Sequence, residues 1–169
     1  CWPRRAGSGE PSEPVVALSV HPTRSGEFAV FMRGARGTAF VAVRGGVGLE
    51  LQPTAIGSST VGLATAPTRD RGDAHVALLG NGGELRSFVA DLSGGAFREA
   101  EGTSRTAGYA TAQRLSMGFT DRPVIGVSTS TSLQLGDVFG PAVTVKPPGA
   151  ASPPVVASAA GEAFVLTPV

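Results

Sequence analysis

Three side chains that could bind a metal ion lie within six residues of one another: Asp70, Asp73 and His75. Carboxylate and imidazole groups are common ligands of divalent ions, but a site needs three or four convergent ligands and supporting hydrogen bonds. No other part of the chain repeats this spacing, and His21 is the only other histidine. We therefore interpret the cluster as a polar turn before a strand, and we expect neither a metal nor another cofactor.

Other catalytic patterns are weak. The chain has no Gly-x-Ser-x-Gly element that would present a serine nucleophile, and no Ser-x-x-Lys pair includes its single lysine, Lys146. The Gly45-Gly46-Val47-Gly48 run lacks the strand–loop–helix setting of a phosphate-binding loop. A Ser–His–Asp triad is recognised by geometry, not by spacing, and two histidines offer few ways to build one. We predict a protein that is not an enzyme, without catalytic or cofactor-binding residues.

The same turn carries a different candidate chemistry. Arg71, Gly72 and Asp73 spell a tripeptide known from cell adhesion, in which an extended Arg and Asp flank a Gly. Loops on a rigid scaffold are common binding sites, so we predict a partner-binding loop made of Arg69, Arg71, Asp73 and His75. Loops 21–27 and 118–123 are further candidates. The alternative is an ordinary exposed turn, in which a Gly between charged residues is the usual choice.

Short runs rich in Val, Phe, Leu and Thr, bounded by Gly, Pro, Asn, Asp or Ser, predict β-strands throughout the chain. Residues 105–117 also carry helix-forming residues, and there we favour a strand. Phenylalanines at strand positions are predicted to be core: Phe28, Phe31, Phe40, Phe88, Phe119, Phe139 and Phe164. The predicted strands are 15–20, 28–32, 39–43 and 49–52, then 61–66, 75–79, 85–91 and 96–99, then 109–117, 124–128, 132–138 and 142–145, and a last pair from residue 155.

These runs fall into four-stranded units that recur roughly every 45–48 residues. Pro14-Val15-Val16-Ala17 returns as Pro154-Val155-Val156-Ala157, and Phe40-Val41-Ala42 returns as Phe88-Val89-Ala90. We place the units at 14–57, 58–102 and 103–149, with a partial unit at 150–169. The prediction is an all-β fold of repeated four-stranded antiparallel units.

A four-stranded unit of this length resembles a β-propeller blade. Ala90-Asp91 and Gly136-Asp137 stand where WD-repeat blades have Trp-Asp. The resemblance implies a propeller-like fold of about three and a half blades, whereas propellers close with roughly four to eight. Three interpretations stay open. The chain is part of a longer propeller, it is completed by a partner or a second copy, or its units fold as an irregular β-sandwich.

The first residue is the only cysteine, Cys1, and residues 2–13 are rich in Gly, Ser, Pro and charge. This end resembles a mature bacterial lipoprotein, which implies a lipid on Cys1 and a flexible tether over residues 1–13. A start within a longer chain is the alternative. We expect an extracytoplasmic location, periplasmic or at the cell surface, with the lipid as the sole membrane attachment.

Composition narrows the function further. Hydrophobic residues make up 41% of the 169 residues and charged residues 16%, which indicates a globular chain, and the net charge of +1 is not that of a nucleic-acid-binding protein. We predict a non-catalytic interaction or scaffold module, an accessory subunit of a larger complex. Its expected partners are proteins or further blades that complete the fold. The alternative function is a carbohydrate-binding or hydrolytic propeller.

Overall fold

Antiparallel β-strands account for all the regular secondary structure that the computed structural model describes, and no helix occurs in the described part of the chain. The expected all-β class is therefore confirmed. The structure describes residues 13–23, 28–43, 52–68, 73–92, 98–106, 112, 114–129, 132–137, 143–145, 153–159 and 162–166.

The strands form three four-stranded sheets and a two-stranded hairpin, each in simple chain order. The first sheet contains β1 (Val15–Pro22), β2 (Phe28–Gly34), β3 (Ala39–Val43) and β4 (Gln52–Gly57). The second sheet contains β5 (Thr60–Pro67), β6 (Asp73–Gly80), β7 (Glu84–Asp91) and β8 (Arg98–Thr106). The third sheet contains β9 (Arg114–Phe119), β10 (Pro123–Ser128), β11 (Leu133–Asp137) and β12 (Val143–Val145). The terminal hairpin pairs β13 (Val155–Ala159) with β14 (Glu162–Leu166).

The predicted strand 109–117 is observed as β9, Arg114–Phe119, and the last strands of the first two sheets also begin later than expected. The predicted strand 49–52 overlaps β4 only at residue 52, and residues 49–51 lie outside the described residues. The predicted strand 96–99 is observed as β8, Arg98–Thr106. Both are the last strand of a sheet with one hydrogen-bonded neighbour, and the β8 sequence REAEGTSRT lacks an alternating apolar pattern. Backbone pairing with the preceding strand, rather than side-chain pattern, sets their ends.

The first two sheets are built on the same local geometry. Gly37 and Gly83 have φ of +89° and +84°, a conformation that glycine adopts without the penalty of a Cβ atom. The Gly37 N–H donates to the Gly34 carbonyl oxygen and the Gly83 N–H to that of Gly80, both at 3.0 Å. Each glycine therefore closes the turn between the second and third strands of its sheet.

The turn between β2 and β3 is stabilised by further hydrogen bonds. Glu13, the last residue of the predicted tether, is buried, and its carboxylate accepts hydrogen bonds from the backbone N–H groups of Arg36 and Thr38. A hydrogen bond with the Thr38 side chain lowers the pKa of Glu13. Residues 1–12, with Cys1, lie outside the described residues.

Neighbouring sheets pack face to face in chain order, through three apolar seams. The first seam contains buried residues of the first and second sheets, Ala29, Phe31, Ala39, Val41, Ile56, Ala74, Val76, Leu78, Phe88, Ala90 and Leu92. The second seam joins the second and third sheets through Ala64, Ala77, Leu79, Leu85, Leu115, Ile125 and Val127. In the third seam, Val156 of the terminal hairpin covers Gly118 and Gly126 of the third sheet.

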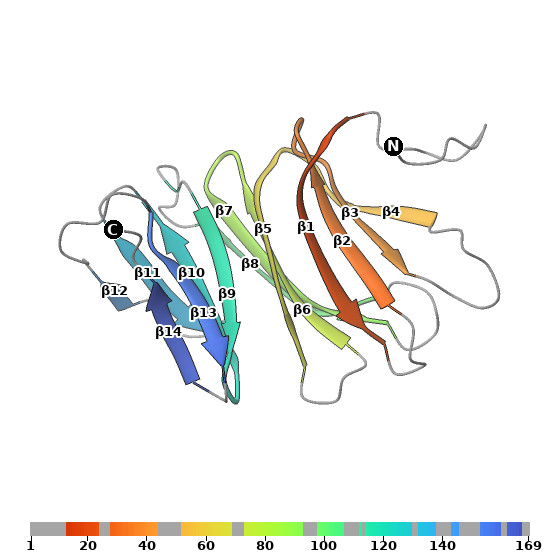
Figure 1. The fold of residues 1–169 in the computed structure, drawn as a ribbon. Helices are drawn as coiled ribbons and strands as arrows, with labels where there is room; N and C mark the ends of the chain where they lie inside the picture. Colours follow the sequence, from red (N-terminus) through yellow and green to blue (C-terminus); the bar gives the residue numbers. More distant parts are fainter. Residues whose placement is uncertain are drawn as a thin grey trace.

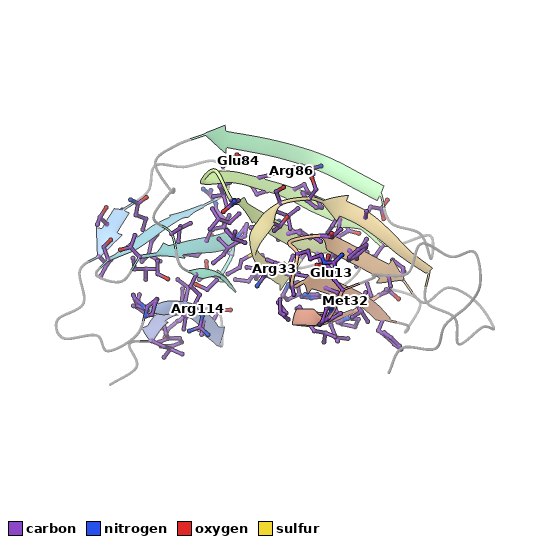
Figure 2. All side chains as sticks on the ribbon, turned by 90° about the horizontal axis from the view of Figure 1, so that it is seen from above. Glu13, Met32, Arg33, Glu84, Arg86 and Arg114 are labelled. Atoms are coloured by element: carbon purple, nitrogen blue, oxygen red, sulfur yellow. The ribbon has the colours of Figure 1, made fainter. Side chains whose placement is uncertain are left out.

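The stack of sheets bends into an arc with the first strands β1, β5, β9 and β13 next to one another (Figure 1). Seen from above, β8 lies on the outer side of this arc (Figure 2). The described strands do not close a ring. Face-packed antiparallel sheets agree better with the predicted alternative, an irregular sandwich, than with a closed propeller.

Candidate interaction surface

A small polar network lies inside the first seam, where β1 meets β5. The Nε2 atom of His21 is 3.1 Å from Ser19 Oγ and 2.6 Å from Thr65 Oγ1, and the Thr65 hydroxyl donates to Ser19 Oγ at 2.6 Å. The imidazole also meets Phe31 edge to face, with ring centroids 5.7 Å apart. The network therefore links the first and second sheets through side chains that the sequence pattern did not single out as a group.

The Ser19–His21 contact has the atoms of a nucleophile and its base, but its setting differs from that of a catalytic pair. His21 is only 6% exposed, and burial lowers its pKa. Among the described residues no carboxylate is hydrogen-bonded to its other ring nitrogen. A neutral, covered imidazole in this position can satisfy the two hydroxyl groups and hold the seam together.

The first strands of all four units run in the same direction and end at one rim, the lower edge in Figure 1. All three predicted binding loops follow these strand ends. The described residues of the rim include Pro22 of β1, Pro67 of β5 and Phe119 of β9. After β9, the Thr120 hydroxyl donates to Asp121 Oδ1 at 3.0 Å, and the Thr120 N–H donates to the Arg122 carbonyl oxygen at 3.0 Å. This turn is therefore ordered by its own polar groups.

The structure describes two of the four predicted partner-binding residues, Asp73 and His75. Both are half-buried on β6, and the His75 ring stacks on Phe119 of the third sheet, with centroids 5.8 Å apart and planes at 23°. Burial lowers the pKa of His75, and the Asp73 charge opposes this shift. The rings therefore join two sheets near the rim. Arg69 and Arg71 lie outside the described residues, so the loop as a whole stays a prediction.

Exposed apolar side chains gather at the two ends of the stack, on surfaces that we call the β1 face and the β14 face. The β1 face is Val16, Leu18 and Val20, which alternate along β1 and are 53%, 60% and 54% exposed. The β14 face is Phe164 and Leu166, which are 44% and 51% exposed. The prediction that Phe164 belongs to the core is wrong, because no described strand packs on its side of the terminal hairpin.

The described residues hold neither a metal-binding cluster nor a membrane-spanning helix. Within the described residues no three His, Cys, Asp or Glu side chains are grouped so that they could hold a metal ion. In the same part of the chain no helix is long and apolar enough to cross a membrane. Comparison with known proteins finds no matching family model, curated protein or solved structure. The exposed β1 and β14 faces and the rim are therefore the candidate functional surfaces of the described residues.

Proposed function

We propose that this chain is a non-catalytic protein-interaction or scaffold module, an accessory subunit that works outside the cytoplasm and is tethered to a membrane through a lipid on Cys1. The observation that carries the proposal is the exposure of the β1 and β14 faces. Together they present five large apolar side chains on two regular strands. Soluble proteins keep such patches small unless another protein covers them.

The architecture that we propose is an arc of a β-propeller. Each four-stranded sheet is a meander whose first strand lies beside the first strand of the next sheet, and this arrangement is expected for successive blades around a channel. An open arc leaves the β1 and β14 faces exposed, whereas the β2 and β3 side chains on the same side of the first sheet as the β1 face are buried, namely Val30, Met32, Phe40 and Ala42. A protein partner or further blades would then cover the β1 and β14 faces.

The rim is the second proposed binding surface. It combines strand ends from several sheets, with the His75–Phe119 stack close behind them. A rigid scaffold with loops at one rim is a common arrangement for recognition. We propose that Arg69, Arg71 and Asp73 contact the partner there.

Site-specific photo-crosslinking in the native cell tests the proposal. A benzophenone side chain placed at Leu18 or Phe164 is expected to crosslink to protein, and one at Val143 is the control. Val143 is 64% exposed and lies on β12, outside the residues that define the two faces. Equal crosslinking at all three positions, or none at Leu18 and Phe164, would contradict the proposal.

The rim has its own test. Replacing Arg69, Arg71 and Asp73 together by Ala should reduce the yield of crosslinks from a benzophenone at exposed Arg122 while the melting temperature stays unchanged. An unchanged yield would remove this loop from the binding surface.

The membrane tether is tested by the intact mass of the protein from its native membrane fraction. A lipid adduct on Cys1 is expected. A polypeptide that extends beyond Cys1, or an unmodified Cys1 thiol, would overturn the tether and leave the interaction proposal to the crosslinking experiments.

A further inference from the structure

The β1 face corresponds to a surface that is used for packing in the second sheet. Val15 pairs with Gly34 and Thr60 with Gly80, and each strand pair has a bulge at the next residue. We align β1 with β5 by matching Val15 to Thr60. In this alignment, the residues of β5 that correspond to Val16, Leu18 and Val20 are Val61, Leu63 and Thr65. Leu63 packs against the first seam, and Thr65 reaches Ser19 and His21 across it. In β5 these positions therefore face the preceding sheet.

The β14 face corresponds to a surface that, in the first sheet, packs against the following sheet. The repeated sequence places Phe164 and Leu166 at the positions of Ala29 and Phe31 in β2. Both β2 residues are 0% exposed, because the second sheet covers them in the first seam. The same positions in β14 are about half exposed because no described sheet follows the hairpin. This surface is therefore of the kind that receives a following sheet.

We propose that a second copy of this chain joins these two ends, so that the β14 face of one copy packs on the β1 face of the other. This proposal rests on the proposed function and names its partner. The β1 face is of the kind that packs on a preceding sheet, and the β14 face is of the kind that packs on a following sheet. The two faces can therefore pack on each other. The contact would continue the series of three seams already present within the chain.

The curvature of the stack favours two copies over an open chain of copies. Successive sheets follow an arc, so that head-to-tail addition bends the assembly back on itself (Figure 2). A head-to-tail contact closes when its rotation returns to the starting point. Two identical contacts related by a two-fold axis then cover both β1 faces and both β14 faces.

Analytical ultracentrifugation of the 169-residue chain over a concentration series, with a reductant that keeps Cys1 from forming a disulfide, tests the proposal. The expected species is a dimer. Leu18→Asp and Phe164→Asp should each weaken the dimer by roughly 30-fold or more, as loss of a central interface residue does. Val143→Asp, the same kind of change at an exposed position outside both faces, should leave it intact. Circular dichroism checks that each variant is folded.

Mixing the two variants identifies the head-to-tail geometry. The Leu18→Asp copy keeps its β14 face and the Phe164→Asp copy keeps its β1 face, so the mixture can form one intact contact. The mixture should therefore associate more tightly than either variant alone. If the mixture associates no more tightly than either variant alone, head-to-tail pairing is overturned. If the wild-type chain stays monomeric, the proposal that the partner is a second copy is overturned. In either case, crosslinks from Leu18 to a different protein would leave the proposed function standing.

Discussion

At the scale of single residues, the first seam contains one ionisable group whose charge state matters for folding. His21 is enclosed by Ser19, Thr65 and Phe31, and burial lowers its pKa below the ordinary value of 6.5. The folded protein therefore binds a proton at His21 less readily than the unfolded chain does. Stability from this group is fully present above the ordinary pKa and is lost as the pH falls below it.

We expect the free energy of unfolding of the wild-type chain to decrease between pH 7.5 and pH 5, and His21→Gln to reduce this slope. Glutamine keeps a polar atom near the Nε2 position but does not titrate. Burial shifts the pKa of His75 in the same direction, so the variant that combines His21→Gln with His75→Gln should have the flattest profile. Urea unfolding at several pH values measures the slopes. A His21→Gln slope equal to that of wild type would show that His21 does not titrate in this way.

At the scale of elements, glycines set how closely neighbouring sheets approach one another. A Cβ atom on Gly126 would lie 2.6 Å from Val156 Cγ2, and one on Gly62 would lie 2.8 Å from Leu115 Cβ. The Ser116 hydroxyl of β9 also accepts the Val156 N–H at 2.9 Å. The hairpin and the third sheet are therefore in contact through backbone as well as side chains, and the space for Val156 exists because residue 126 has no side chain.

Gly126→Ala should destabilise the protein by about 1–3 kcal/mol, the usual cost of overpacking. Val156→Ala removes the methyl groups that collide, so the double variant should be destabilised by less than the sum of the two single changes. Thermal and urea unfolding of all four proteins gives the coupling energy. Additive effects would mean that Gly126 and Val156 do not share this space.

At the scale of the whole molecule, the stability of each sheet depends mainly on its contacts with the sheets that are adjacent in the chain. Each sheet packs on the sheets adjacent in the chain, and the hydrophobic clusters of the first and second seams are separate. In such linear arrays, a local change affects its own unit and the adjoining interface most strongly. Phe31 of the first seam and Leu133 of the third sheet are both 0% exposed and belong to different ends of the stack.

Phe31→Ala should cost about 3–5 kcal/mol and should increase amide hydrogen exchange most in β1–β3. Leu133→Ala should increase amide hydrogen exchange most in β10 and β11. Hydrogen-exchange mass spectrometry of the two variants compares the two ends within one protein. Equal loss of protection in every sheet from either change would show a single cooperative unit instead of a linear array.

Much of the local structure could be predicted from the sequence. Strands β2, β6 and β10 lie where short apolar runs bounded by turn residues placed them, because alternation and turn chemistry are local signals. Strand β8 was predicted too short because it is polar and depends on its pairing with β7. The His21 network could not be predicted, since its members are 44 residues apart in the chain and meet only when two sheets pack.

The sequence by itself determined the all-β class and most strand positions, through side-chain alternation and the glycine turns. Only the tertiary structure decided which apolar side chains are covered. Phe31 and Phe164 are the same residue type on second strands, yet Phe31 is 0% exposed and Phe164 is 44% exposed. The difference arises because burial depends on the sheet that follows in space. A second sheet lies against β2, whereas no described sheet lies against this face of β14.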